Sequence, residues 1–440
     1  MAFRKPPQPR ADREGVFGLD SLQIYTILDI ALNVIQIMMI LLVAWFGTVF
    51  VVSLFRKERE ALVSADMNRF GIVICAHNEE AVIANILESI EDQDYPSEGR
   101  HVYLLCDHCT DGTARVGRSH PNVTVYERND GERTGKADVL RWGTRLLLER
   151  HSGEFDVFLY FDADNVIGPD FLRLMNDEFN RGNDVVQSNR LAGEPYRTNV
   201  TKWYAIYWRM LSFFFERAKH ICGFSAIITG TGFAARKEII EEFGWKTVTI
   251  TEDVEFTTQL CLKGKRVAFC EEAVCGDEQP SDIRTMFRQM RRWGTGMIQV
   301  VQRYSGQWGR AMRKNPTKLL FDNILYDLSV ILPIVNLIVM VLRTFLPLIF
   351  LGFFEWMPCI TFFGMSFAFS WIGAAFMVLY HKLPGREFFS AVLTFPAFPL
   401  ILIITNLSAL IYPSRTWSVI PHRGLERRER PALPDVSSDQ

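Results

Sequence analysis

The sequence has little net charge, no second pair of cysteines to complete a metal site and no complete phosphate-binding glycine loop, and each shortage excludes a class of protein. The formal net charge of −2 over 440 residues provides no basic field for a nucleic-acid partner. Cys106 and Cys109 form a C-x-x-C, but no second pair follows at zinc-ligand spacing. The stretch NDGERTGKADVL lacks the G-x-x-x-x-G-K-S/T spacing of a P-loop. We expect reduced cysteines in a cytosolic domain rather than a metal site.

Hydrophobic side chains are abundant and unevenly placed, and they make up 48% of the residues. Residues 35–54 form an uncharged run of the length that a bilayer span of about 20 residues requires. No small-residue cleavage site follows this run, so we expect a signal anchor. The C-terminal part contains further predicted spans at residues 324–342, 360–380 and 388–411. Pro396 and Pro399 are expected to bend the last of these.

The charges beside the predicted spans indicate where the intervening domain lies. Lysine and arginine occur on both flanks, at Arg56, Lys57 and Arg59 before the domain and at Arg303, Arg310, Arg313, Lys314 and Lys318 after it. By the positive-inside rule the domain is cytosolic. The arginine-rich tail also favours the cytosol, although three single crossings after the domain would place it outside. Either residues 324–356 cross twice, or one C-terminal segment only dips into the interface.

In the segment between the spans, strand-like runs alternate with helical patterns. FGIVICA is followed by a helical pattern, and HVYLLCD and DVFLYFDAD come later with helices between them. This βαβα order predicts a parallel sheet covered by helices, with ligands bound at the carboxyl ends of the strands. The polar residues at those ends are His77, Asn78, Glu79, Asp107, Asp162 and Asp164. We expect them to converge on one crevice.

Two stretches in this segment favour metal and phosphate chemistry. Asp162 and Asp164 in YFDADN are two residues apart after a strand, so both carboxylates can face one hard cation such as Mg²⁺ or Mn²⁺. A solvated D-x-D turn is the alternative, and the apolar runs on both sides disfavour it. Lys136 follows a glycine-rich turn at a helix start and can neutralise a diphosphate, with Arg128 or Arg133 assisting. A surface charge cluster is equally consistent with this lysine.

Two further stretches are ambiguous when each is read alone. TITEDVEFTTQL, residues 249–260, has the threonine and acids that are typical of a solvated helix start. RTMFRQMRRWGTGMIQVVQR has apolar residues at three- and four-residue spacing, which predicts an amphipathic helix at a membrane surface. Neither pattern alone separates a structural role from a catalytic one.

Taken together, these stretches resemble the family 2 glycosyltransferases, and in particular their membrane-embedded processive branch. That branch includes cellulose, hyaluronan, chitin and poly-N-acetylglucosamine synthases. The matching pieces, in the order of the family, are AHNEE, CDHCTDGT, GKADVL, FDADN, TGTGFA, TEDVEF and QMRRW. The last matches a Q-x-x-R-W pattern at Gln289, Arg292 and Trp293. The resemblance implies an α/β GT-A fold, with a Rossmann-like mixed sheet, inserted between transmembrane and interfacial helices.

The resemblance also implies a role for each matching residue. Asp253 would be the general base, with Glu252 as its neighbour. The UDP-sugar would be bound by His77, Glu79, Asp107, Lys136, Asp162, Gln289 and Arg292. Asp164, together with Asp162, would hold Mg²⁺ or Mn²⁺. The acceptor sugar would be bordered by Gly230, Thr231, Gly232 and Trp293. Thr416–Gly424 resembles a gating loop with contacts at Trp417, His422 and Arg423, and a plain juxtamembrane tail is nearly as consistent with it.

The expected organisation follows from the spans and the resemblance. The segments are an N-terminal tail (1–20), an interfacial helix plus a transmembrane helix (21–55), a cytosolic GT-A catalytic domain (56–282), amphipathic interface helices with the Q-x-x-R-W motif (283–318), transmembrane helices forming a channel (319–412) and a cytosolic tail (413–440). No added regulatory domain is visible, so we expect no built-in second-messenger module. The family often has two N-terminal spans, whereas this sequence has one clear span.

The resemblance predicts an inverting, processive enzyme of the plasma membrane that makes a β-linked polysaccharide from a UDP-sugar and translocates it. Its partners would be the donor, the growing polysaccharide and membrane lipids, with room for accessory secretion proteins and no nucleic acid. UDP-glucose and UDP-N-acetylglucosamine are both open as donors, and so is UDP-glucuronate. One alternative is transfer of a single sugar to a lipid carrier. Another is a transporter or structural protein with an inactive domain, which intact Asp162, Asp164, Asp253 and Arg292 disfavour.

Overall fold

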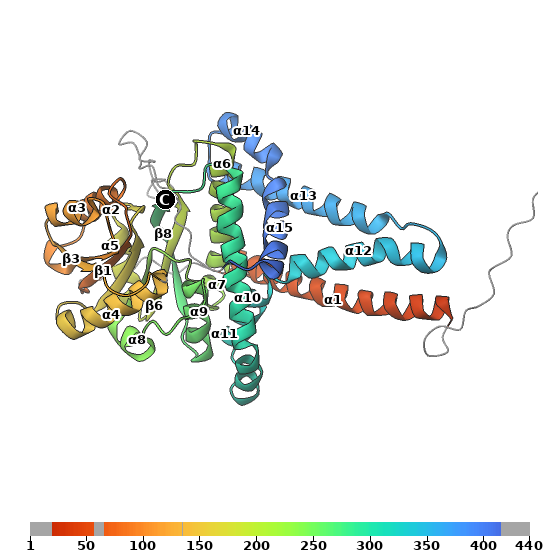
Figure 1. The fold of residues 1–440 in the computed structure, drawn as a ribbon, viewed down its shortest axis with the longest axis horizontal. Helices are drawn as coiled ribbons and strands as arrows, with labels where there is room; N and C mark the ends of the chain where they lie inside the picture. Colours follow the sequence, from red (N-terminus) through yellow and green to blue (C-terminus); the bar gives the residue numbers. More distant parts are fainter. Residues whose placement is uncertain (1–19, 57–65, 134, 415–440) are drawn as a thin grey trace, which may run out of the picture. The chain divides into compact units, whose positions relative to one another are not determined.

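The computed structural model describes residues 20–56, 66–133 and 135–414. The chain divides into two compact units (Figure 1). One unit consists of Met1–Trp45 and Leu332–Phe369, and the other consists of Phe46–Ile331 and Ser370–Gln440. We refer to them as the helical unit and the catalytic unit, and each is described by itself.

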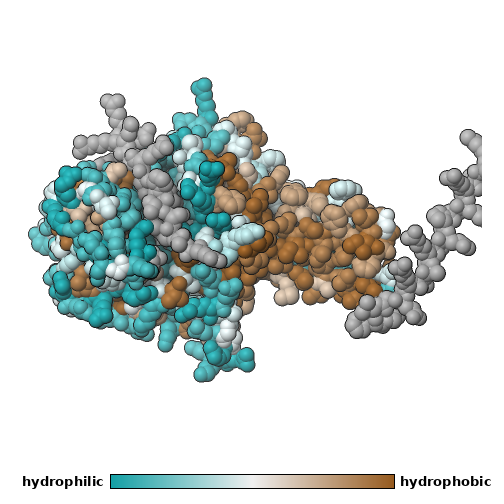
Figure 2. Space-filling view, in the orientation of Figure 1, coloured by the Kyte–Doolittle hydropathy of each residue, from teal (hydrophilic) through white to brown (hydrophobic). Residues whose placement is uncertain are grey.

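The helical unit is built from long apolar helices. They are α1 (Ser21–Leu54), α12 (Leu332–Leu351) and α13 (Met357–Tyr380), of which α1 and α13 continue into the other unit. Among the described residues, these three helices are long and apolar enough to cross a membrane. Their surface is covered by hydrophobic side chains (Figure 2). The interfacial helix and the transmembrane helix expected over 21–55 form one continuous helix, capped at its start by Asp20, whose carboxylate accepts from the Gln23 N–H at 2.7 Å.

The catalytic unit contains one mixed sheet of eight strands within the described residues. The strands are β1 (Phe70–Ala76), β2 (Arg100–Asp107), β3 (Val123–Arg128), β4 (Val157–Asp162), β5 (Val166–Ile167), β6 (Val185–Ala192), β7 (Phe233–Arg236) and β8 (Val267–Asp277), in the order β3-β2-β1-β4-β7-β6-β8-β5. The first four in this order run parallel, as the βαβα pattern predicts. β7 is antiparallel to both of its neighbours, whereas β6 and β8 are parallel to each other. The parallel strands end at one edge, where the site lies.

Helices cover both faces of this sheet because alternate strand residues point to opposite faces. On one face, Ile72 and Ile74 of β1 pack in a core with α2 (Ile83–Glu91), α3 (Thr113–Ser119) and α5 (Phe171–Asn180). On the other face, Val73 joins a core with α4 (Lys136–His151), α8 (Lys237–Phe243) and α9 (Glu252–Leu262). The short η1 (Ser97–Gly99) leads into β2. α4 and α9 matter most for function, since both begin at the site.

A second set of helices packs beside the sheet in the catalytic unit. It comprises α6 (Asn199–Leu211), the π-helix η2 (Ser212–Arg217), α7 (Ala218–Ile221), α10 (Ile283–Lys314), α11 (Lys318–Leu328), α14 (Gly385–Thr394) and α15 (Ala397–Ile411). The amphipathic helix predicted around the Q-x-x-R-W motif is α10, and it packs along α15 (Figure 1). α14 and α15 are bent by 44° at a short break, so they form either one broken span or a re-entrant loop. The bend is where Pro396 was expected to cause one.

The first C-terminal span differs from the expected one. Residues 324–328 belong to α11 of the catalytic unit, and the apolar helix α12 begins only at Leu332. The reason is Asp327, whose buried carboxylate accepts a hydrogen bond from Thr258 of α9 at 2.9 Å. An aspartate held in this way anchors the end of α11 to the catalytic unit.

Candidate active site

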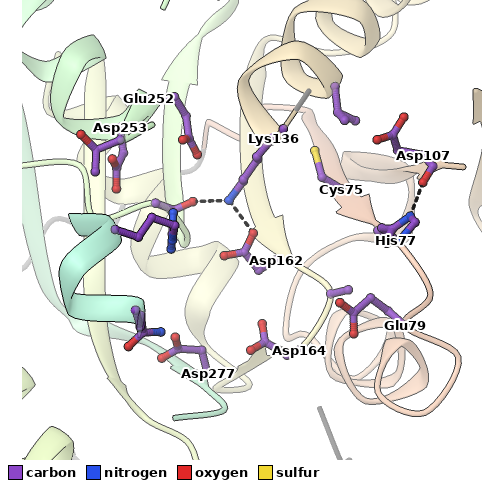
Figure 3. Close-up of a pocket in the computed structure, with 18 of the residues that line it drawn as sticks. Cys75, His77, Glu79, Asp107, Lys136, Asp162, Asp164, Glu252, Asp253 and Asp277 are labelled. Carbon is purple, nitrogen blue, oxygen red and sulfur yellow. Dashed lines mark hydrogen bonds and ion pairs between the residues drawn. The ribbon is translucent and has the colours of Figure 1, made fainter. Parts of the chain in front are cut away.

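One cavity lies at the carboxyl ends of β1, β2 and β4 and brings together most of the predicted site residues (Figure 3). Those that line it are His77, Glu79, Asp107, Lys136, Asp162, Asp164, Gly230, Glu252, Asp253, Gln289, Arg292 and Trp293. They come from the ends of the parallel strands, from the starts of α4 and α9, and from α10. The convergence expected from the strand order is therefore present, and it includes residues from distant parts of the sequence.

Lys136 lies at the centre of the cavity, between a carboxylate and a backbone carbonyl. Its ammonium group forms an ion pair with Asp162 and donates a hydrogen bond to the Gly230 carbonyl at 2.7 Å (Figure 3). Burial disfavours its charge, but the Asp162 and Glu252 carboxylates outweigh that effect and raise the pKa of Lys136. The lysine is therefore a buried, charged group in the cavity and not part of a surface cluster.

The carboxylates near Lys136 fit a divalent metal that is shared with a substrate. Across residues 20–56, 66–133 and 135–414, no group of three or more His, Cys, Asp and Glu side chains is arranged to hold a metal ion. Asp162 and Asp164 nevertheless both line the cavity. Mg²⁺ commonly takes one or two carboxylates and completes its shell with phosphate oxygens and water. This pair fits such an ion, and it does not fit an ion enclosed by protein ligands alone.

Asp107 is buried and already occupied by charged neighbours. Its carboxylate accepts a hydrogen bond from Arg128 Nε at 2.7 Å and lies 2.9 Å from His108 Nδ1. Arg128 also pairs with Asp138 at 2.7 Å, so it links Asp107 to the first turn of α4. The backbone carbonyl oxygen of Asp107 is 2.6 Å from His77 Nδ1. Asp107 is thus held rigidly at the edge of the cavity, where its predicted contact with the base of the nucleotide stays a prediction.

The acids at the start of α9 are not a solvated helix start. Thr251 makes no side-chain capping hydrogen bond there, and Glu252 is only 8% exposed. The Asp253 carboxylate accepts from the N–H of Val254 at 2.8 Å. Burial, assisted by the neighbouring Asp253 charge, raises the pKa of Glu252 to about 7, and burial raises the pKa of Asp253 as well. A buried carboxylate beside a partly buried one, both with raised pKa values, is typical of a site that moves protons.

The TGTGFA stretch borders the cavity through Thr229 and Gly230. Gly230 has a φ of 91°, and a Cβ there would lie 3.1 Å from Asp253 Oδ2, so a glycine leaves space for that carboxylate. Thr231 is buried behind the cavity, and its hydroxyl accepts a hydrogen bond from the Asp162 N–H at 3.0 Å. Gly232 also lies outside the cavity lining. Of the three residues expected to border the acceptor, only Gly230 faces the cavity.

The Q-x-x-R-W residues occupy one stretch of α10. Gln289 accepts a hydrogen bond from the Tyr204 hydroxyl at 2.7 Å, which holds it against α6. Trp293 meets the rings of Tyr204 and Trp208 edge-on, with centroids 6.4 and 5.9 Å apart. Arg292, which lies between these two residues in the sequence, also lines the cavity. α10 therefore presents a cation and an aromatic ring to the same space as Asp253.

Other cavity residues were not identified from the sequence. They are Cys75, Thr229, Arg190, Thr251, Asp277 and Glu278, among others. Arg190 and Asp277 lie at the ends of β6 and β8, two strands that the alternating pattern had not revealed. The rule that ligands meet strand ends would have found both residues once those strands were assigned. The gating-loop residues Trp417, His422 and Arg423 lie outside the described residues, so that prediction is not tested.

The cavity and the fold agree with comparisons to known proteins. Residues 68–296, more than half of the chain, match the family described as Glycosyltransferase like family 2. The chain belongs to this family and is an enzyme that transfers a sugar. A mannosyltransferase from Pyrobaculum calidifontis, solved in complex with GDP-Man and Mn²⁺, aligns with 84% of this chain and 97% of its own at a TM-score of 0.54 and 18% identity. That likeness, together with the mixed sheet, defines the fold as GT-A.

Relatives with known names divide between different products. A probable glycosyltransferase of Bacillus subtilis, YdaM, is 27% identical over 272 residues, or 58% of this chain and 61% of its own. The beta-monoglucosyldiacylglycerol synthase of Synechocystis is 26% identical over 54% of this chain and 49% of its own. The poly-beta-1,6-N-acetyl-D-glucosamine synthase of Staphylococcus aureus is 23% identical over 54% and 57%. The matches therefore span about half to three fifths of these relatives.

Proposed function

We propose that this enzyme is an inverting, processive glycosyltransferase. It polymerises a β-linked polysaccharide from UDP-glucose or UDP-N-acetylglucosamine and passes the product across the plasma membrane. The observation that carries the proposal is the single cavity in which the Asp253 carboxylate faces the cations Lys136 and Arg292 and the carboxylates Asp162 and Asp164. A base, diphosphate-binding cations and a carboxylate pair for a metal are the parts that sugar transfer requires.

The proposed mechanism is one direct displacement. A sugar hydroxyl is a weak nucleophile, so Asp253 takes its proton as the new bond forms at the anomeric carbon. Lys136 and Arg292 offset the charge that develops on the departing diphosphate. A divalent metal held by Asp162 and Asp164 supplies further charge neutralisation when bound. Attack from the opposite face inverts the anomeric centre, so an α-linked UDP-sugar gives a β-linkage.

The relatives support both the proposed product and one alternative. A relative named as a poly-N-acetylglucosamine synthase supports polymerisation. Trp293 on α10 supports it as well, because an aromatic ring beside the base can carry the last sugar of a chain. Relatives named as monoglucosyldiacylglycerol synthases favour transfer of one sugar to a lipid instead.

We also propose a multi-pass topology with the catalytic unit in the cytosol. α1 enters the membrane, and α12 and α13 leave and return as a hairpin. If the bent pair α14–α15 is re-entrant, the arginine-rich tail returns to the cytosol, which removes the conflict between span count and charge.

The function is tested with the full chain purified in detergent. The enzyme is incubated with Mg²⁺ or Mn²⁺ and each common UDP-sugar, and UDP release is measured together with product size. We expect long polymer from one donor, and a loss of at least about 100-fold in Asp253→Asn, because general-base catalysis contributes about 10²–10⁴-fold. UDP release with only a lipid-linked product would establish the alternative. No UDP release from any donor would overturn both.

A further inference from the structure

Four residues beside the cavity form a closed ring of interactions. Arg190 pairs with Asp277, and Asp277 accepts a hydrogen bond from Gln279 Nε2 at 2.7 Å. The Gln279 carbonyl oxygen accepts from Trp208 Nε1 at 3.2 Å, and the Trp208 ring lies 4.3 Å below the Arg190 guanidinium. All four side chains are nearly buried, and none was assigned a role above. The ring holds Arg190 and Asp277 in a fixed geometry at the cavity wall.

The ring lies next to the general base. A Cβ at Gly230 would be 3.1 Å from Asp253 Oδ2 and 3.9 Å from Arg190 Nη1, so both groups border the same point. Asp277 lies on the Asp253 side of Lys136, away from Asp107 (Figure 3). Trp293 contacts Trp208 edge-on at 5.9 Å, which brings an aromatic ring beside the pair. Any molecule whose hydroxyl reaches Asp253 therefore has the Arg190–Asp277 pair within its reach.

The pair retains hydrogen-bonding capacity toward the cavity, which both residues line. Arginine has five N–H donors, and the contacts of Arg190 with Asp277 and with the Thr229 carbonyl use three of them. Asp277 Oδ2 accepts two N–H groups of Arg190, whereas Oδ1 accepts one side-chain donor, from Gln279, and has a second lone pair. A rigid donor beside a rigid acceptor matches two neighbouring hydroxyl groups, each of which can donate and accept.

Charge around the pair favours an uncharged partner. Asp277 already balances the charge of Arg190. The pair therefore offers no unpaired cation to an anionic sugar, whereas neutral hydroxyl groups need none. A pocket with an aromatic wall and a few fixed polar groups is a typical small-molecule site.

We propose that Arg190 and Asp277 bind two neighbouring hydroxyl groups of an uncharged sugar ring on the acceptor. This rests on the proposed UDP-sugar transfer and narrows its substrate class. The acceptor presents a sugar, either free or at the end of a lipid-linked chain, and not the single hydroxyl of a diacylglycerol. The pair is a specificity determinant for the acceptor and leaves donor binding to the other side of the cavity.

The test is the double variant Arg190→Gln with Asp277→Asn in the full chain. Removing both charges avoids leaving one buried charge unpaired. A matched control is Arg69→Gln with Asp156→Asn, an exposed ion pair of 2.8 Å outside the cavity. UDP affinity and donor hydrolysis without acceptor are measured first. UDP release is then titrated with tetrasaccharides of β-linked glucose and of β-linked N-acetylglucosamine, with a lipid-linked disaccharide, and with dioleoylglycerol in mixed micelles.

We expect the double variant to keep UDP affinity and donor hydrolysis within about twofold. Its KM for a sugar acceptor should rise at least about tenfold, the effect of losing one or two hydrogen bonds to charged groups. The control should match the wild type. An unchanged sugar KM, or stimulation by dioleoylglycerol alone, would overturn the sugar subsite and leave UDP-sugar transfer intact. If the double variant fails to bind UDP, the KM for the sugar acceptor is measured in Asp277→Asn alone, and the same rise or lack of a rise supports or overturns the proposal. A wild-type enzyme without UDP release would overturn both proposals.

Discussion

The three carboxylates at the start of α9, Glu252, Asp253 and Glu255, are chemically alike but lie in different environments. Asp253 faces the cavity beside Gly230, with one oxygen held by the N–H of the next residue. Glu252 is buried next to it. Glu255 is fully buried and accepts from the N–H groups of Val248 and Thr249, each at 2.7 Å. It therefore fixes the loop that leads into the helix. The family resemblance implied roles for Asp253 and Glu252, but the structural role of Glu255 could not be predicted, because it depends on which backbone groups its carboxylate meets.

The first prediction concerns pH and Glu252. Asp253 must be ionised to act as a base, and burial raises its pKa, so activity should be lost on acidification at a higher pH than for an ordinary aspartate. Glu252, with a pKa of about 7, is protonated where Asp253 ionises, so Glu252→Gln replaces one neutral group by another and should leave the acidic limb of the kcat/KM profile in place. The profile is measured by UDP release. A limb that shifts in Glu252→Gln would indicate that Glu252, and not Asp253, is the group whose ionisation limits activity.

At the scale of elements, the glycines of α10 set how closely its neighbours approach. A Cβ at Gly294 would lie 2.5 Å from Asn406 Oδ1 of α15, and one at Gly296 would lie 2.4 Å from Thr251. Gly306, in the same helix, has nothing within 4 Å of its Cβ position. The WGTGM sequence therefore allows α10 to pack closely against Thr251, which precedes the proposed general base and its neighbour.

The second prediction follows from this packing. Gly296→Ala should displace Thr251 and the start of α9, and we expect a fall in kcat of roughly 100-fold, since misplacement by about 1 Å can cost that much. Gly306→Ala is the matched control. It should keep full activity and gain up to about 1 kcal/mol of helix stability. Both are compared by UDP release and by thermal unfolding in detergent. Equal activity in the two variants would show that the close approach is unimportant.

Another element-scale feature is a buried charged cluster between η2, α7, α9 and α11. Lys219 pairs with Asp322 at 2.8 Å, and both are almost fully buried. Glu216 of the π-helix accepts from the Ile227 N–H at 3.0 Å. Burial raises the pKa of Glu216 to about 7 and the pKa of Asp327 to about 8. The cluster joins the helices that support the catalytic helix.

The third prediction is a stability that falls as the pH rises. The folded-state pKa values of Glu216 and Asp327 lie above those of an unfolded chain, so folding takes up protons. Their contribution is fully present below the unfolded pKa of about 4 and is lost as pH rises through about 7 to 8. Unfolding in detergent, followed by tryptophan fluorescence, should occur at a lower temperature at high pH. Glu216→Gln should weaken this dependence, and an unchanged slope would exclude Glu216 as its source.

Strands and helices differed in how well the sequence revealed them. The parallel strands β1, β2 and β4 contain apolar runs, so these strands and the polar residues at their ends were predictable. β6 mixes polar and apolar residues although nearly all of its positions are buried, so no apolar run marks it, and Arg190 near its end was missed for that reason. The boundary at Leu332 could not be predicted either, since only tertiary contact shows that Asp327 faces Thr258. A local sequence pattern indicates which residues are buried, but the position of a residue in the fold depends on its tertiary contacts.

At the scale of the whole molecule, the remaining question is how many times the chain crosses the membrane. Among the described residues, α1, α12 and α13 are long and apolar enough to cross a membrane, and the bent α14–α15 pair would add one crossing or none. The pair belongs to the same compact unit as α10, along which α15 packs. That packing favours a re-entrant segment over a separate span.

The fourth prediction is the side of the membrane reached by each loop. Cysteines are introduced at Phe354, Glu387 and Ser437 in a background in which the partly exposed Cys75, Cys109 and Cys359 are replaced by serine, and they are labelled with a membrane-impermeant maleimide. Phe354→Cys, between α12 and α13, should react in intact cells, whereas the other two should react only after permeabilisation. Labelling of Ser437→Cys in intact cells would mean that the bent pair crosses fully and would overturn the re-entrant topology.

The ring formed by Arg190, Trp208, Gln279 and Asp277 has a consequence for how such enzymes diverge. Its members come from three different elements and a loop, yet each satisfies the next. Exchanging one member alone would leave a buried donor, acceptor or charge without its partner, which is costly. Inherited changes at the four positions should therefore occur as a set. Chains that retain the whole set would form a subgroup that shares one acceptor chemistry, whatever the overall sequence identity.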